Sequence, residues 1–130
     1  MDSKTPRVYV VTAVHNDKDT TVRFLKSVLS SNFNFNNVRV VVVDDGSTDG
    51  TGECIENIFT NVVVLRGNGS LWWTGSMKLA ISYVLKKAKT TDFVLTINND
   101  CLISKDYIKN IVDSGKHNKR SIIGSVIMDI

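Results

Sequence analysis

The stretch that most constrains the fold is residues 92–100, where an apolar run ends abruptly in three polar side chains. Only Thr96, which strands accept readily, interrupts the run. A run without alternation is typical of a strand covered on both faces, as in a parallel sheet. Ligands of open α/β sheets bind beyond the carboxyl ends of the strands. Asn98, Asn99 and Asp100 therefore stand where chemistry is expected, although such residues also end strands as ordinary turn formers.

Other apolar runs end in the same way. Val8–Val14 stops at His15-Asn16-Asp17, and Val38–Val43 is followed by the polar stretch 44–50, Asp-Asp-Gly-Ser-Thr-Asp-Gly. Further strands are predicted at Asn61–Leu65 and Ser121–Met128. Because parallel strands present their carboxyl ends at one edge, three polar clusters are predicted to gather there.

Segments with helical spacing of apolar residues separate these strands. The predicted helices are Asp19–Ser31, Glu53–Phe59, Thr74–Ala88 and Ser104–Gly115, with N-caps at Asp17 or Asp19, at Thr74 and at Ser104. Strand and helix alternate through residues 1–130 without a repeat or a linker, which indicates a single domain. The predicted fold class is α/β, a Rossmann-like, mostly parallel sheet with helices on both faces.

Composition excludes several classes of protein. With 130 residues, of which 42% are hydrophobic and 22% charged, the chain can bury a core. A net charge of +3 is too small and too evenly spread to indicate nucleic-acid binding, and Lys86, Lys87 and Lys89 are interpreted as a solvated helix end.

The two cysteines, Cys54 and Cys101, form no CxxC pair, and no histidine cluster has metal-site spacing. Neither a disulfide framework nor a zinc site is indicated, which favours a reducing, cytoplasmic setting. The N-terminal residues lack an apolar signal region, and no apolar stretch reaches the roughly 18 residues that span a bilayer. The segment is therefore expected to be soluble.

Several common ligand motifs are absent. The sequence Gly67-Asn68-Gly69-Ser70-Leu71-Trp72 has Trp where a dinucleotide fingerprint needs its third Gly, and it does not follow a first strand. No GxxxxGK[ST] phosphate loop occurs. The paired acids follow the second strand, whereas a response-regulator receiver carries them after the first. His15 and His117 belong to no nucleophile-and-base arrangement that the sequence specifies.

The ordered combination of motifs resembles a known family. The stretch 41–51, Val-Val-Val-Asp-Asp-Gly-Ser-Thr-Asp-Gly-Thr, followed by Ile-Asn-Asn-Asp at 97–100, is similar to the nucleotide-binding half of the family 2 glycosyltransferases, which have the GT-A fold. The stretch 67–77, Gly-Asn-Gly-Ser-Leu-Trp-Trp-Thr-Gly-Ser-Met, is similar to a loop and helix start in bacterial members that resemble rhamnosyltransferases. The resemblance covers nearly the whole chain and implies a role in polysaccharide biosynthesis.

The resemblance implies a site for a UDP- or dTDP-linked sugar. The implied nucleotide-binding residues are Thr12, Ala13, Val14, Asn16, Asp44, Asp45, Gly67, Gly69, Trp72, Gly75, Asn98 and Asn99. Asp44 and Asp45 would accept hydrogen bonds from the base and the ribose, as a carboxylate is suited to do. The family's DxD motif, which holds Mg²⁺ or Mn²⁺, reads Asn98-Asn99-Asp100 here, so Asp100 is the implied metal ligand.

Gly67 and Gly69 are expected to allow close approach of the backbone to a ligand. Trp72 and Trp73 offer flat surfaces for a sugar or a base, and the alternative is that both are core or interface aromatics. Lys78 stands where relatives often have Asn, which leaves the corresponding sugar contact open.

The implied reaction is metal-dependent transfer of a sugar to a hydroxyl of a glycan or lipid-linked acceptor, usually with inversion. The family's catalytic base lies beyond the position of Ile130, and neither Asp113 nor Asp129 is a convincing substitute. We therefore expect a donor-binding half with little activity of its own. We also expect this half to self-associate. For the full-length protein the resemblance implies peripheral membrane association. The alternative is a non-catalytic nucleotide-binding or assembly module; a nucleotidylyltransferase is disfavoured because its Gly-rich loop after the first strand is absent.

Overall fold

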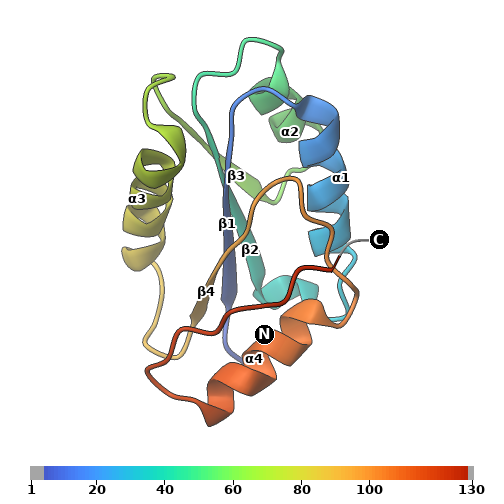
Figure 1. The fold of residues 1–130 in the computed structure, drawn as a ribbon, viewed down its shortest axis with the longest axis vertical. Coiled ribbons are helices and arrows are strands. Elements are labelled where there is room, and N and C mark those ends of the chain that lie inside the picture. Colours follow the sequence, from blue (N-terminus) through green and yellow to red (C-terminus); the bar gives the residue numbers. More distant parts are fainter. Residues whose placement is uncertain (1–4, 129–130) are drawn as a thin grey trace.

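The computed structural model describes residues 5–128, which form a four-stranded parallel sheet in the order β3-β2-β1-β4 (Figure 1). The strands are β1 (Val8–Val14), β2 (Val38–Asp44), β3 (Val62–Arg66) and β4 (Phe93–Thr96). The helices are α1 (Lys18–Leu29), α2 (Thr51–Ile58), α3 (Trp72–Leu85) and α4 (Tyr107–His117), with a 3-10 turn η1 at Phe35–Asn37. The predicted α/β fold with a parallel sheet is confirmed. Asp129 and Ile130 lie outside the described residues.

Helices cover both faces of the sheet, as predicted. On one face, Val8 and Val10 of β1 pack with α1, α2 and α4, and on the other Tyr9 and Val11 pack under α3. Consecutive side chains of a strand point to opposite faces, so the continuous valine runs of β1 and β2 serve two cores at once. Figure 1 shows α3 alone on its side of the sheet.

The prediction that β4 is covered on both faces is wrong. Phe93 and Leu95 pack into the core under α1 and α4, whereas Val94 is 41% exposed and Thr96 is exposed too. The reason is position, because β4 is an edge strand and the core under α3 contains residues of β1, β2 and β3 only.

The predicted strand at Ser121–Met128 is also wrong. The segment is extended but pairs with no strand of residues 5–128, and it touches α4 through a 2.7 Å hydrogen bond between the hydroxyls of Tyr107 and Ser125. A strand needs a neighbour for its backbone groups, and without one Ile122 and Val126 stay almost fully exposed. The predicted self-association of this surface stays a prediction.

Two helix starts differ from their predicted caps. Helix α3 begins at Trp72, before Thr74, and α4 follows Asp106 although Ser104 was the predicted cap. Asp17 precedes α1 as predicted, but its side chain makes no capping bond. In the case of α3 the cause is the Asp45 carboxylate, which accepts from the amides of Leu71 and Trp72.

Candidate functional site

The carboxyl ends of three strands lie in register at one edge of the sheet. Val14 of β1 pairs with Asp44 of β2, which pairs with Arg66 of β3. The loops that follow these strands gather at the top of the molecule in Figure 1. The predicted clustering of polar side chains at this edge is therefore borne out for the segments after β1 and β2, and the loop after β3, which was not among the predicted clusters, joins them.

Asp45 holds the loop that follows β3. Its Oδ1 accepts a hydrogen bond from the Gly69 amide at 2.8 Å, and its Oδ2 accepts from the amides of Leu71 and Trp72 at 2.9 Å each. The carboxylate thus satisfies the amides at the first turn of α3, which is the work of an N-cap. This is why α3 begins at Trp72. The buried side chain of Asp45 is committed to the architecture of the loop.

Close backbone contact accompanies this arrangement. Gly46, in the left-handed region with φ +74°, lies so close to Gly69 that a Cβ at Gly46 would stand 2.8 Å from the Gly69 Cα. A Cβ at Gly67 would meet the Asp45 Oδ1 at 2.5 Å. These glycines therefore let the loops after β2 and β3 lie against each other.

Asp44 is 2% exposed and lies in an ion pair. Its Oδ2 accepts from the Arg66 guanidinium at 2.8 Å, and its Oδ1 accepts from the Ser47 amide at 2.9 Å. Arg66 also lies 2.8 Å from a carboxylate oxygen of Glu56 and 3.5 Å from one of Glu53. The buried acid is thereby neutralised by one half-exposed cation that three carboxylates share.

The segment after β1 is tied to the loop after β2. The Asn16 amide donates to the Ser47 hydroxyl at 2.7 Å, the Asn16 side-chain oxygen accepts from the Thr48 amide at 2.9 Å, and His15 Nδ1 lies 2.6 Å from the Asp45 carbonyl oxygen. Asn16 has a positive φ of 60°, which Asn tolerates better than most residues. Three loops are thus joined into one block.

The end of β1 lies beneath this block. Thr12 and Val14 are buried and Ala13 is half-buried. The Thr12 hydroxyl finds no hydrogen-bond partner within residues 5–128. Val14 packs in the core under α1 and α2, whereas Ala13 packs against the core under α3, so the three positions predicted to line the base alternate between the two faces of the sheet.

The segment after β4 is much more open. Asn98 and Asp100 are exposed, and the half-buried Asn99 donates from its Nδ2 to the Thr21 hydroxyl on α1 at 2.9 Å. Thr21 in turn donates to the Asp17 carbonyl at 2.9 Å. Asn99 thus joins the end of β4 to the first turn of α1 and leaves its neighbours Asn98 and Asp100 directed to solvent.

A cavity of about 230 Å³ adjoins Asp100. Thr20 and Arg23 line it from α1, and Asn99, Asp100, Cys101 and Leu102 line it from the other side. Burial raises the pKa of the Cys101 thiol, and the Asp100 carboxylate, whose Oδ1 lies 3.8 Å from the sulfur, raises that pKa further. The thiol is therefore protonated at neutral pH, and Cys101 serves as a weak donor to Asp100.

Comparison with known proteins decides the family. The sequence profile described as "Glycosyl transferase family 2" matches residues 9–130. The chain belongs to this family. A comparison with curated proteins gives no match.

Solved structures of glycosyltransferases share its fold. Residues 1–349 of S. aureus TarS are 24% identical, with a TM-score of 0.69 over 92% of this chain and 39% of that one. The same TarS fragment with UDP-GlcNAc is 24% identical, with a TM-score of 0.72 over 92% and 37%. The mannosyltransferase PcManGT from Pyrobaculum calidifontis, with GDP-Man and Mn²⁺, is 19% identical, with a TM-score of 0.71 over 85% and 32%.

The likeness to these structures shows the GT-A fold, and the chain spans about two fifths of the TarS fragment or less. Family membership and fold together show that residues 9–130 form a family 2 glycosyltransferase domain of the GT-A fold. No helix within residues 5–128 is long and apolar enough to cross a bilayer.

The metal position of this family 2 domain can be tested against the side chains present. Residues 5–128 contain no group of three or more His, Cys, Asp or Glu side chains that could hold a metal ion by themselves. Asp100 is an exposed carboxylate, and its one recorded partner in that part of the chain is the Cys101 thiol. One free carboxylate at a ligand edge fits a hard cation that takes its other ligands from phosphate oxygens and water.

The two tryptophans lie at the start of α3 and are not core residues. Trp72 is 80% exposed and Trp73 is 57% exposed. Trp72 has a positive φ of 53°, rare for a bulky residue, and its amide is held by Asp45. Gly75 lies one turn further on, where a Cβ would meet that of Leu71 at 3.0 Å. Exposure excludes the core alternative for both tryptophans, whereas their roles as ligand surfaces or interface aromatics stay predictions. Lys78 is also exposed.

Arg66 is the residue that the sequence prediction missed. The predicted strand ends at Leu65, one residue earlier, whereas Arg66 ends β3 directly beside Asp44 and pairs with it. A signal was present, because a basic residue at the carboxyl end of a strand next to one that ends in two acids favours an ion pair. Glu53 and Glu56, one helical turn apart on α2, complete the cluster.

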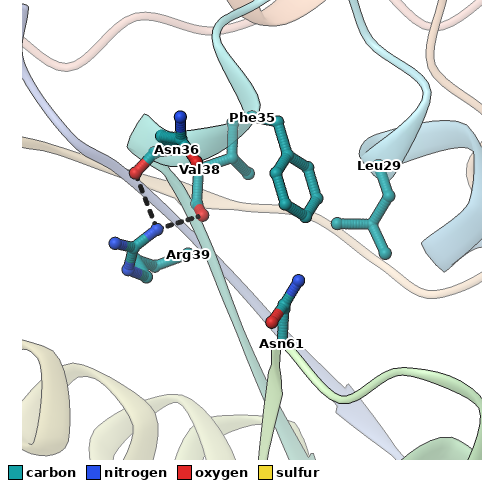
Figure 2. A pocket seen from close by; sticks show the side chains of 6 residues that line it. All are labelled: Leu29, Phe35, Asn36, Val38, Arg39 and Asn61. Atoms are coloured by element: carbon teal, nitrogen blue, oxygen red, sulfur yellow. Dashed lines mark hydrogen bonds between the residues drawn. The ribbon is translucent and has the colours of Figure 1, made fainter. Parts of the chain in front are cut away.

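A second cavity, of about 340 Å³, lies away from this edge. Figure 2 shows its lining near the amino ends of β2 and β3, formed by Leu29, Phe35, Asn36, Val38, Arg39 and Asn61. The Arg39 guanidinium donates to the Asn36 and Val38 carbonyls at 2.8 and 3.0 Å. The cavity contains none of the predicted site residues, so the candidate site is the opposite edge.

Proposed function

We propose that this domain binds a UDP- or dTDP-linked sugar for metal-dependent, inverting transfer to a hydroxyl of a glycan or lipid-linked acceptor. The observation that carries the proposal is the exposed Asp100 carboxylate, which has no cationic partner in residues 5–128 and follows β4 at the ligand edge of a family 2 domain. TarS, which shares the fold, has been solved with UDP-GlcNAc, and PcManGT with GDP-Man and Mn²⁺.

Asp44 and Asp45 would contribute to the nucleotide end of the site in two ways. They fix the loops around it, and they retain some acceptor capacity, because a carboxylate has about four acceptor positions. Asp44 uses two of these positions and Asp45 uses three. The remaining positions suit the N–H of a uracil or thymine base or a ribose hydroxyl. Of the three positions at the end of β1, the half-buried Ala13 is the one with surface to offer the base, because Thr12 and Val14 are buried.

Asp100 would hold the cation, and Asn98 would contact sugar or ribose through its exposed amide. A bound Mg²⁺ or Mn²⁺ would stabilise the negative charge that develops on the departing diphosphate. Asn99, which is bonded to Thr21, would fix the backbone that presents Asp100. In the transfer, the acceptor oxygen bonds to the anomeric carbon, the bond to the diphosphate breaks, and the acceptor proton passes to a base.

Neither the three acids of the candidate site nor Asp113 is a convincing base. Asp44 and Asp45 are buried in hydrogen bonds, Asp100 is assigned to the cation, and Asp113 on α4 pairs with Lys109 at 3.1 Å. We therefore expect the 130-residue chain to bind nucleotide without transferring sugar. Rapid glycosylation of a simple acceptor by this chain would contradict that expectation.

Calorimetric titration of UDP with Mn²⁺, with Mg²⁺ and with a chelator tests the site. Wild-type protein should bind UDP more tightly with either cation, and Asp100→Ala should lose most of that enhancement because it removes the only assigned protein ligand. Asp113→Ala, which removes a half-exposed acid of α4, should keep the enhancement in full. If Asp100→Ala also keeps the metal enhancement, the metal assignment is wrong. If GDP binds as tightly as UDP and dTDP, the assignment of a uracil or thymine nucleobase is wrong.

A further inference from the structure

Helix α3 is the only described helix on its face of the sheet, so its outer side has no protein neighbour within residues 5–128 (Figure 1). Its inner side is well packed. Met77, Ala80 and Val84 are buried against the alternate residues of β1 and β2. A helix packed on one side ordinarily presents charged and polar residues on the other.

The outer side of α3 departs from that pattern. Leu79 is 36% exposed and Leu85 is 68% exposed, and they follow the exposed Trp72 and Trp73 along the helix. Trp72 and Leu79 are seven residues apart and therefore lie on the same stripe. We name the residues Trp72, Lys78, Leu79, Leu85, Lys86, Lys87 and Lys89 the α3 outer face. Trp73 is exposed too, but it lies four residues before Met77 and therefore on the stripe that packs on the sheet.

Charge on this face has one sign. The stretch 67–91 contains four lysines, all exposed, and no Asp or Glu, although the whole chain carries only +3. The segment around α4 differs, because there Asp106 and Asp113 accompany the lysines and Lys109 is paired with Asp113. Lys87 lies 5.2 Å from the Tyr83 ring centroid, and none of the four lysine side chains forms an ion pair within the described residues. Asp92, one residue beyond this stretch, accepts from the backbone amide of Lys89 at 2.8 Å.

We propose that the α3 outer face docks on the surface of a lipid bilayer that carries anionic headgroups. Tryptophan suits the headgroup level because its ring is apolar and its indole N–H is polar. Lysine can lay its methylene stem along apolar surface while its ammonium reaches a phosphate. Each lysine near an anionic leaflet strengthens binding about fivefold. Isolated leucines between lysines suit insertion among headgroups better than they suit the continuous contact of a protein interface.

Docking in this way would place the candidate site beside the membrane. The two tryptophans begin α3 at the edge that carries Asp44 and Asp45, since Asp45 bonds the Trp72 amide directly. The face can be tested without any nucleotide, so the outcome is independent of the proposed donor.

Flotation with vesicles of phosphatidylcholine alone, or of equal parts phosphatidylcholine and phosphatidylglycerol, tests the proposal. Wild-type protein should float with the anionic vesicles only, and raised salt should release it. The triple substitution Lys86→Gln, Lys87→Gln, Lys89→Gln should weaken binding about a hundredfold, at about fivefold for each lysine. Its matched control, Lys105→Gln, Lys116→Gln, Lys119→Gln, removes the same charge around α4 and should bind like wild type.

A second pair of variants separates insertion from simple charge attraction. Leu85→Ser should weaken binding to anionic vesicles and reduce the blue shift of tryptophan fluorescence, whereas Ile58→Ser, which alters a 51% exposed residue on α2, should change neither. Thermal melts confirm that each variant is folded. Failure of the wild type to bind, or equal loss in both lysine triples, would overturn the proposal.

Discussion

The polar clusters after β2 and after β4 have similar sequences and opposite surroundings. Asp44 and Asp45 are buried and together accept five hydrogen bonds from the protein. Asn98 and Asp100 are exposed, and only Asn99 of that trio is bonded to another element through its side chain. The first cluster builds the edge, and the second leaves it open to a ligand. An acid at a strand end is therefore interpretable only when its hydrogen-bond partners are known.

The largest expected effect is a loss of stability when the buried cluster after β2 is disrupted. Asp45→Ala leaves three amides without their acceptor, and bonds to a charged group contribute about 1.5–3 kcal/mol each without full additivity. We expect a loss of about 3 kcal/mol or more in the free energy of unfolding, measured by urea denaturation. Asp100→Ala should cost less than about 0.5 kcal/mol, as exposed substitutions usually do. Equal losses for the two variants would abolish the distinction.

Arg66→Met gives the next largest effect. The substitution leaves the buried Asp44 carboxylate with the Ser47 amide as its one remaining protein donor. Hydrogen bonds to charged groups suggest a loss of about 2 kcal/mol in unfolding free energy. Glu56→Gln, which removes an exposed partner of the same arginine, should cost about 1 kcal/mol or less. A larger effect at Glu56 than at Arg66 would show that Asp44 needs no cation.

The fold was largely predictable, because dense valine runs and helical spacing are local signals. The site was less so. Asp45 caps α3 and Arg66 neutralises Asp44 because particular loops meet at the edge. The spacing of residues within one segment does not show which loops meet. The failure at Ser121–Met128 has the same cause, because an apolar run becomes a strand only beside a partner.

A smaller effect is expected at the exposed cluster after β4. Asn99→Ala removes the bond to Thr21 and should cost about 1 kcal/mol of stability. Because Asn99 holds the backbone before Asp100, we also expect a weaker Mn²⁺ enhancement of UDP binding in calorimetry. Asn98→Ala, at an exposed neighbour, should leave stability unchanged. An unaltered Mn²⁺ enhancement in Asn99→Ala would show that Asp100 needs no such support.

The smallest effect concerns Asp49, an exposed acid in the loop after β2. A hydrogen bond from the Thr51 hydroxyl, assisted by backbone bonds, lowers the pKa of Asp49. Since the folded pKa lies below the unfolded one, this stabilisation is present above the unfolded value and is lost as pH falls through the folded value. Thr51→Val should raise the pKa of Asp49 in an NMR titration, and Thr51→Ser should preserve it. The opposite order would contradict the assigned cause.

The bonds that join the loops after β1, β2 and β3 have a kinetic consequence. Because Asn16, Ser47, Thr48 and Asp45 tie these loops together, the edge has little left to order when a nucleotide arrives. Association should then proceed in one exponential phase whose rate rises linearly with UDP concentration, without a slower rearrangement. The amides of Gly69, Leu71 and Trp72 should likewise exchange with deuterium as one group, since they share a single acceptor.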